Sequence, residues 1–311
     1  MSRVYEIADR FVEKFAALDP ISATFMGVAG HDDRLSDYSP QGAAALNGLA
    51  SGLLRDAGKA QPEGERDRVC RDTVIDEQRL SIAIFDAGEH VRNLNTMHCP
   101  VQGIRMVFDM MPRATEADWR NIAARMALVP WALGRYRASL DEGLRRGVVA
   151  AKRQTEGAAK QAEVWAGLND RKPFFAGLAE ESGKAGINNT ALRKDLERGA
   201  QAASEAYSGI VAYLRQTYLP KAAQCDGVGR DRYALWAHTY NGAPVDLEET
   251  YAWGWEQLNW VRSEMKKTAA KIKPGGTARD AIDLLETDPP RAIEGVEPFR
   301  QWMQDLQDRT I

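Results

Sequence analysis

The stretch that most constrains the fold runs from Asp246 to Ile272, where apolar side chains recur every three or four positions. These residues are Leu247, Tyr251, Trp255, Leu258, Val261, Met265, Ala269 and Ile272. An α-helix has about 3.6 residues per turn, so this spacing gathers them on one face. Asp246 and Glu249 form a D-x-x-E helix start. We therefore predict a long amphipathic helix that begins at Asp246.

Helical spacing also dominates the rest of the chain, and no segment alternates apolar and polar residues well enough for a strand. Helices are expected at 2–18, from Ser39-Pro40, at 65–92, from Thr115, at 190–218 and from Thr277. Pro130 should kink or break the helix that follows Thr115. Loops are expected near 27–38, 93–100, 168–189, 224–230, 241–245, 273–277 and 286–297. The predicted fold class is all-α, a large assembly of long helices with at most a short strand or two.

The last residues, Pro298 to Ile311, carry an apolar stripe at helical spacing. The stripe consists of Phe299, Trp302, Met303 and Leu306. No Gly or Asn closes this helix, and domains seldom expose such a stripe to water. We therefore expect a truncated chain, in which residues 1–311 are the helical N-terminal portion of a longer protein with a subdivision near 100–115. If the chain is complete, the stripe predicts a partner or an oligomer interface.

The composition narrows the class of partner and the compartment. The net charge is −3 and the pI is about 5.9, which does not indicate a nucleic-acid or membrane partner. No apolar run approaches the ~20 residues that cross a bilayer, and the N-terminus lacks a signal-peptide core. Cys70, Cys99 and Cys225 are few, odd in number and far apart. This pattern favours a reducing, cytoplasmic location over a disulfide scaffold.

A zinc site is the first chemistry to consider, because histidine is the commonest metal ligand. The four histidines are His31, His90, His98 and His238. A helical zinc hydrolase places two of them at i and i+4 beside a glutamate, as in H-E-x-x-H, and this chain has no such motif. Glu89-His90 has no second histidine near it, and His98-Cys99 is an isolated pair. We predict that this chain alone holds no metal and no catalytic residue.

Other signals also have an ordinary structural explanation. Nucleophile elbows and complete phosphate loops are absent. The arginines between 113 and 153 favour a solvated helix face; they include Arg120, Arg125, Arg135, Arg137, Arg145 and Arg146. The aromatic segment Tyr233 to Tyr240 is either a pocket lining or, more commonly, core packing with satisfied donors. Its polar members Tyr233, His238 and Tyr240 are the candidates for a substrate cleft.

Several stretches together resemble the N-terminal half of a bacterial family, the domain of unknown function 885. The stretches are 19–27 (DPISATFMG), 33–40 (DRLSDYSP), 229–233 (GRDRY), 241–242 (NG) and 246–249 (DLEE). The resemblance covers nearly the whole chain in order and spacing. It implies a helical zinc metallopeptidase of the gluzincin kind, about twice this length, whose metal motif H-E-x-x-P-G-H-H lies in a C-terminal half that is absent here.

The resemblance therefore implies that this chain is a scaffold that forms one half of a helical cleft. Its early helices would limit access to the metal, and the helix from Asp246 would pack beneath it. The chain would be inactive alone, with the missing C-terminal half as its partner, a peptide-like substrate, and zinc bound only with that half. The alternative is a self-standing helical binding or scaffold protein without catalysis.

Overall fold

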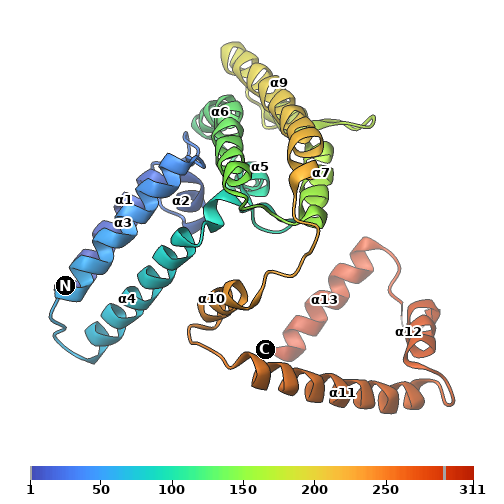
Figure 1. Ribbon diagram of the computed structural model, residues 1–311. Coiled ribbons are helices and arrows are strands. Elements are labelled where there is room, and N and C mark those ends of the chain that lie inside the picture. The colour runs from blue at the N-terminus through green and yellow to red at the C-terminus, as the bar shows by residue number, and fades with distance from the viewer. Residues whose placement is uncertain (1, 290–291) are drawn as a thin grey trace. The chain divides into compact units, whose positions relative to one another are not determined.

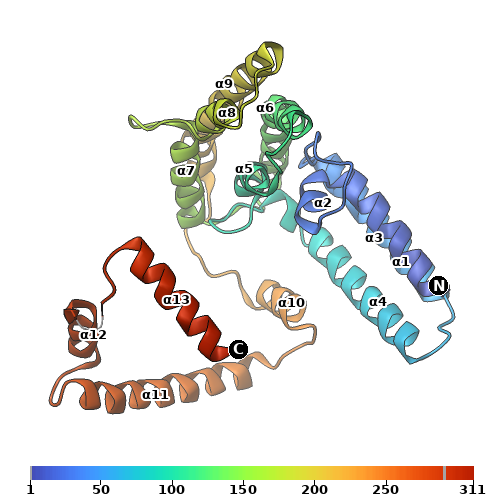
Figure 2. The same ribbon diagram turned by 180° about the vertical axis from the view of Figure 1, so that it is seen from behind.

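The computed structural model describes residues 2–289 and 292–311, and the described part is built from α-helices (Figures 1 and 2). The α-helices of the longer first part are α1 (Arg3–Leu18), α2 (Pro20–Met26), α3 (Pro40–Lys59), α4 (Glu65–Asp86), α5 (Pro100–Met110), α6 (Glu116–Arg146), α7 (Lys152–Ala166), α8 (Phe174–Lys184), α9 (Thr190–Tyr213) and α10 (Arg230–Asn241). They are followed by α11 (Leu247–Ile272), α12 (Ala278–Thr287) and α13 (Val296–Thr310). Short turns of other helix types are η1 (Glu89–Val91), η2 (Leu214–Tyr218) and η3 (Leu219–Lys221).

The predicted all-α class is confirmed. Within the described ranges, the only β-type pairing is an isolated parallel bridge between Ala151 and Ala223, and no strand forms. No helix of this part of the chain combines the length and the apolar character that a membrane span needs.

The chain divides into two compact units, residues 1–242 and residues 243–311. Residues 100–115, where a subdivision was predicted, lie inside the first unit. The assignment of the chain as an N-terminal portion and that subdivision remain predictions.

The core of the first unit lies between α6 and α9, with α5, α7 and α8 packed around them (Figures 1 and 2). Phe175 of α8 is fully buried and meets Phe108 edge-on at 5.3 Å between ring centroids and Tyr207 at 5.6 Å. Gly199 lets α9 approach α6 closely, because a Cβ at this position would lie 3.0 Å from the Cβ of Met126. Small and aromatic side chains thus interlock at this interface.

The helices α1, α3 and α4 form a second layer of the same unit, which Figure 2 shows as three long, nearly parallel rods. Their contact is built by Val4, Ile7, Leu53 and Ala60, with Phe11 and Val74 at its edge. The layer explains the helical spacing predicted for 2–18 and for 65–92, although α4 ends at Asp86 and the separate turn η1 follows it.

Two local predictions were wrong, each because packing outweighed a local preference. The predicted loop 168–189 contains α8, whose Phe175 and Leu178 are buried in the core. Pro130 does not break α6, which continues from residue 116 to residue 146. The cost of the lost hydrogen bond is offset by Val129, Ala132 and Leu133, which are buried beside it. The predicted loop 286–297 includes residues 290–291, which lie outside the described residues.

The second unit consists of α11, α12 and α13. The predicted helix starts are confirmed: Asp246 accepts hydrogen bonds from the backbone of Glu248 and Glu249, and Thr277 forms a capping box with Asp280. Ala269 and Ala281 are its buried residues among those described. The predicted stripe forms in α13 and is exposed, with Trp302 at 41% and Met303 at 46%.

Candidate functional site

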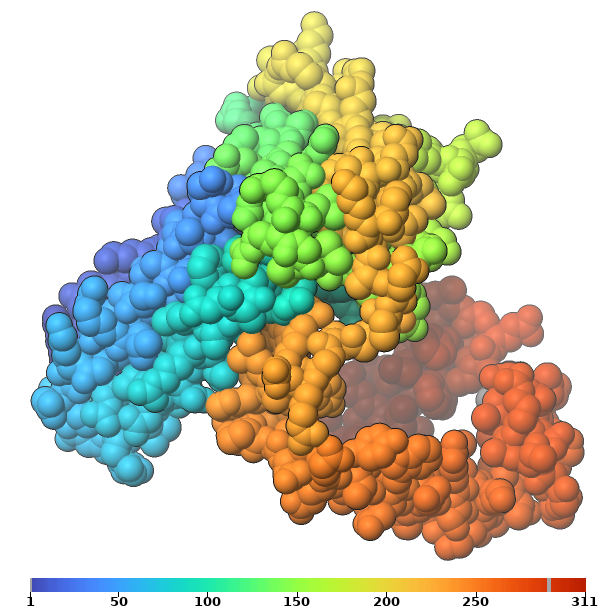
Figure 3. Space-filling view, in the orientation of Figure 1, coloured from blue at the N-terminus to red at the C-terminus, as the bar shows by residue number. Residues whose placement is uncertain are grey.

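A large cavity in the first unit has a volume of about 1190 Å³. This is larger than the roughly 300–1,000 Å³ of typical small-molecule sites. Its walls are the C-terminal turn of α4, η1, the loop 93–98, the segments 147–154 and 223–228, and α10. Figure 3 shows the atoms of α10 in orange beside those of α4 and η1 in cyan and teal. The cavity therefore lies where segments distant in sequence come together.

Two glycines allow the chain to turn at the cavity wall. Gly88 has φ +75° and directly precedes η1; glycine adopts this left-handed conformation at little cost. Gly143 of α6 has no side chain, so the backbone of Val91 can approach it: a Cβ there would lie 2.3 Å from the Val91 oxygen. Together they place η1 against α6, and Glu89 of η1 reaches Arg232 of α10.

Glu89 is the centre of the polar wall. Its side chain is only 6% exposed, and its carboxylate oxygens accept hydrogen bonds from Arg92 Nε at 2.9 Å, Arg232 Nε at 2.7 Å and Arg232 Nη2 at 2.8 Å. The pair with Arg232 is the bidentate arrangement that guanidinium and carboxylate favour. Since Arg232 belongs to α10, this pair ties α10 to η1 across 143 positions of sequence.

His90 lies beside this pair and stacks on Phe85, with ring centroids 4.3 Å apart and an interplanar angle of 11°. Burial lowers the pKa of His90, and the charge of Arg146 lowers it further. The imidazole is therefore neutral at neutral pH, and it adds an aromatic surface to the cavity rather than a charge.

The predicted cleft residues all lie on α10, but they differ in position. Tyr240 lines the cavity together with Trp236, on which it stacks at 5.8 Å. Tyr233 is 57% exposed and does not belong to the cavity lining. His238 lies 3.7 Å from the Asp76 carboxylate of α4 and also stays outside that lining. The assignment of Tyr233, His238 and Tyr240 to a substrate cleft remains a prediction.

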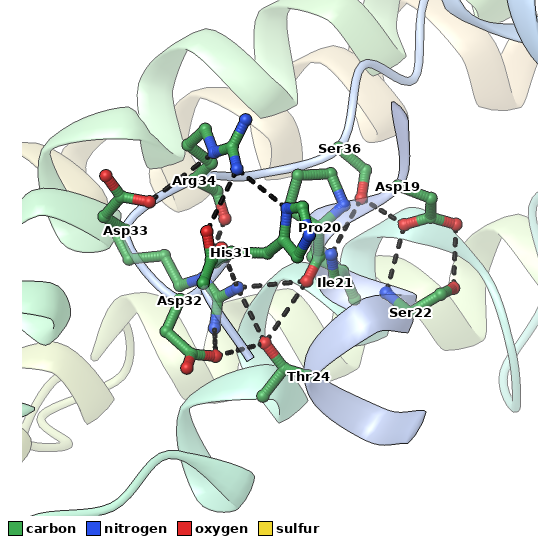
Figure 4. Close-up of polar contacts among 12 residues, drawn as sticks. Asp19, Pro20, Ile21, Ser22, Thr24, His31, Asp32, Asp33, Arg34 and Ser36 are labelled. Atoms are coloured by element: carbon green, nitrogen blue, oxygen red, sulfur yellow. Dashed lines mark hydrogen bonds and ion pairs between the residues drawn. The ribbon is translucent and has the colours of Figure 1, made fainter. Parts of the chain in front are cut away.

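The motif segment, residues 19–37, contains the DPISATFMG stretch and the first part of the DRLSDYSP stretch. A second polar network, shown in Figure 4, fixes its conformation. Asp19 caps α2 by accepting from Ser22 N, and it also accepts from the hydroxyls of Ser22 and Ser36. Thr24 donates to Asp32 at 2.7 Å, and His31 Nδ1 lies 2.7 Å from Arg34 Nη2. The side chains of the His31-Asp32-Asp33 turn are thus engaged in fixing the loop.

Arg125 of α6 anchors this loop. Its Nε donates to Arg34 O at 2.8 Å, and its Nη2 donates to Thr24 Oγ1 at 2.8 Å and to the backbone oxygens of Pro20 and His31, both at 3.1 Å. The expectation of a solvated arginine face is therefore wrong at Arg125, whose side chain is 0% exposed. Backbone carbonyls of the loop replace water as its hydrogen-bond partners.

The metal-ligating side chains of the described residues are dispersed. In residues 2–289 and 292–311, no three His, Cys, Asp or Glu side chains are grouped so as to hold a metal ion. His31 is engaged with Arg34, His90 with Phe85, and His238 lies near Asp76. The cavity nevertheless has the aromatic surfaces and the few charged groups that are typical of a ligand site.

These features define an all-helical protein whose first unit contains a large, mixed polar and aromatic cavity. The chain belongs to the family described as "Bacterial protein of unknown function (DUF885)", whose model matches residues 20–311. This match confirms the family that the sequence motifs indicated, whereas the assignment to its N-terminal half and the relation to metallopeptidases stay predictions. A search of the curated proteins found no match.

Two solved structures share the fold. The first is described as a "putative lipoprotein from Colwellia psychrerythraea"; it has a TM-score of 0.74 and 14% identity, covering 99% of this chain and 58% of that one. The second, a "putative lipoprotein of unknown function from Shewanella oneidensis", has a TM-score of 0.68 and 15% identity, covering 99% and 57%. This chain therefore spans less than three-fifths of the length of either structure.

Proposed function

We propose that this chain forms the substrate-binding side of a hydrolase that acts on peptide-like substrates, and that the metal and the catalytic groups come from outside these 311 residues. The observation that carries the proposal is the 1190 Å³ cavity, whose lining combines the aromatic side chains of Trp236 and Tyr240 on α10 with the Glu89–Arg232 pair. Aromatic walls and a few fixed polar groups are typical of sites that bind and orient small molecules.

The lengths of the structural relatives support a two-part arrangement. Each relative is longer than this chain, which covers 58% and 57% of them. A large helical portion can shape a cavity and exclude water while a separate motif supplies the metal, and zinc hydrolysis needs both contributions.

The decisive experiment compares the 311-residue chain with the product of the complete reading frame. Both are assayed for bound zinc and for hydrolysis of a mixed peptide library. Zinc and hydrolysis in the longer protein alone are the expected result. A longer protein that binds no metal and cleaves no peptide would refute the hydrolase proposal and favour the self-standing binding or scaffold protein. The exposed stripe of α13 would then be a candidate partner surface.

The same longer protein tests the cavity. Alanine at Tyr240 or Trp236 is expected to raise KM about tenfold, because each removes an aromatic wall. Alanine at Tyr233 and at His238 tests the other two predicted cleft residues. Tyr5 of α1 is 39% exposed and lies outside the cavity, so Tyr5→Ala is the matched control. Equal KM values for Tyr240→Ala and Tyr5→Ala would show that the substrate does not bind in this cavity.

The cellular location is part of this proposal. Both structural relatives are described as lipoproteins, and a lipoprotein is anchored to a membrane through covalently attached lipid. Those descriptions point away from the predicted cytoplasmic location, which rested on the free cysteines, and they favour the cell envelope. Fractionation of cells that produce the complete protein distinguishes the two locations.

A further inference from the structure

The charged residues that line the cavity do not balance. The positive side chains are Arg92, Arg153 and Arg232, and the negative ones are Glu89 and Asp226. Arg153 pairs with Asp226 at 3.0 Å, and Glu89 is shared between Arg92 and Arg232. Two arginines thus face one carboxylate, and the wall carries one uncompensated positive charge.

The positive groups are also the more accessible members of this cluster. The side chains of Arg92 and Arg232 are 20% and 28% exposed, whereas that of Glu89 is 6% exposed. Arg92 donates from Nε to Glu89 and from Nη2 to the backbone oxygen of Ala87. Arg232 donates from both Nε and Nη2 to Glu89. Among the contacts of the described residues, neither Nη1 has a partner within the protein. Guanidinium donors are therefore available at the wall of a cavity that can admit a ligand.

We propose that this cavity binds the free carboxylate of its ligand through Arg92 and Arg232, with the attached side chain against Trp236 and Tyr240. One excess positive charge matches a monoanion better than the dianion of inorganic phosphate, because a second negative charge would remain unpaired. The inference assigns the cavity to the end of a peptide that carries the free carboxylate. It rests on the proposed function, because that proposal is what makes the ligand a peptide.

The test is binding to the 311-residue chain, measured by isothermal titration calorimetry with N-acetylphenylalanine and with its carboxamide. The two probes share the aromatic ring and differ in the carboxylate alone. At least tenfold tighter binding of the acid, falling as salt rises, is expected. Equal affinities for acid and amide would overturn the proposal, and so would tighter binding of inorganic phosphate than of the acid.

The sign of a charge change separates recognition of the carboxylate from a structural role. Glu89→Gln removes the competing negative charge at nearly constant shape, so it should tighten binding of the acid about fivefold and leave the amide unchanged. Glu163 of α7 pairs with Arg215 outside the cavity lining, so Glu163→Gln is the matched control with the same net charge. A merely structural Glu89 would weaken binding of both probes when replaced.

A second variant keeps the test decisive if Glu89→Gln loosens α10. Asp226→Asn removes the other acid of the lining from the loop 223–228, which is outside α10, and should tighten acid binding about twofold. Unchanged or weaker acid binding in both variants would refute the proposal. The site itself is located through Cys225, an exposed thiol in the lining: in a Cys70→Ser background, bound acid should slow its alkylation.

The two proposals fail separately. Peptide hydrolysis by the complete protein together with equal binding of acid and amide would leave the proposed function standing and remove the carboxylate site. Selective binding of the acid by a complete protein that cleaves no peptide would support the carboxylate site and refute the hydrolase proposal.

Discussion

Replacement of Arg125 by methionine tests the polar anchor of the motif segment. Methionine has a similar length and no charge, so Arg125→Met removes the four hydrogen bonds that the guanidinium donates. Three of the abandoned acceptors are backbone oxygens of residues 20, 31 and 34, in a loop that also encloses the partly exposed Asp32. Burial lowers the pKa of Arg125 to about 10, so the group is still protonated at neutral pH and its hydrogen bonds are charge-assisted.

The magnitude follows from the groups left behind. Each buried acceptor without a donor costs about 1–3 kcal/mol, and part of this cost is offset because the guanidinium no longer has to be desolvated. The net loss should therefore fall at about 3–5 kcal/mol, the range for breaking a buried charged interaction. With a urea m-value of about 3 kcal/mol/M, the midpoint shifts by about 1–1.7 M.

The assay is urea unfolding of the full chain followed by far-UV circular dichroism, with hydrogen exchange of residues 20–36 as a local measure. Arg120 lies on the same helix, is 62% exposed and pairs with Glu116, so Arg120→Met should cost less than about 0.5 kcal/mol. If the two variants unfold at the same urea concentration, Arg125 does not anchor the loop and the reasoning is wrong.

Three further outcomes are expected. Hydrogen bonds from Arg135 lower the pKa of Asp37 to about 2, so the contribution of Asp37 is present above its unfolded pKa near 3.8 and is lost as the pH falls toward 2. Asp37→Asn should cost about 1 kcal/mol at pH 7 after solvent screening. The difference from wild type should be much reduced in melts at pH 2 and should vanish at still lower pH. Gly143→Ala places a methyl 2.3 Å from a backbone oxygen of η1 and should destabilise by about 1–3 kcal/mol, whereas Gly134→Ala on the same helix meets nothing and should stabilise by about 0.5–1 kcal/mol. Arg232→Ala should speed hydrogen exchange in α10 at least tenfold without changing α9, because α10 has no buried residue and depends on this ion pair; unchanged exchange would refute that dependence.

Most of the helices could be predicted from the sequence because their signals are local. The D-x-x-E start at Asp246, the box at Thr277 and the Ser39-Pro40 start each depend on neighbours within one turn, and all three cap helices as expected. The helix α8 was missed because its boundaries lack strong caps, and its stability comes from Phe175 inserted between Phe108 and Tyr207. Those contacts span distances in sequence that periodicity cannot show.

The candidate site was only partly predictable for the same reason. The aromatic residues of α10 are visible as a cluster in the sequence, and Tyr240 does line the cavity. Glu89 and Arg232 carried no signal as a pair, because 143 positions separate them. The arginine-rich pattern gave a wrong prediction at Arg125, because the sequence does not reveal that the backbone carbonyl oxygens of a distant loop accept its hydrogen bonds.

The Glu89–Arg232 pair has two consequences, one for the stability of α10 and one for the charge of the cavity. It holds α10, a helix without a buried residue, against η1. It also fixes the charge of the cavity, because Glu89 neutralises only one of its two arginines. A ligand that binds Arg232 through the nitrogen not used by Glu89 would add a contact to α10 from the cavity side. Binding energy and the stability of α10 are then linked, since a ligand that binds only the ordered helix stabilises it by RT ln(1 + [L]/Kd). The helix that completes the cavity is therefore the element whose order a bound ligand should increase most.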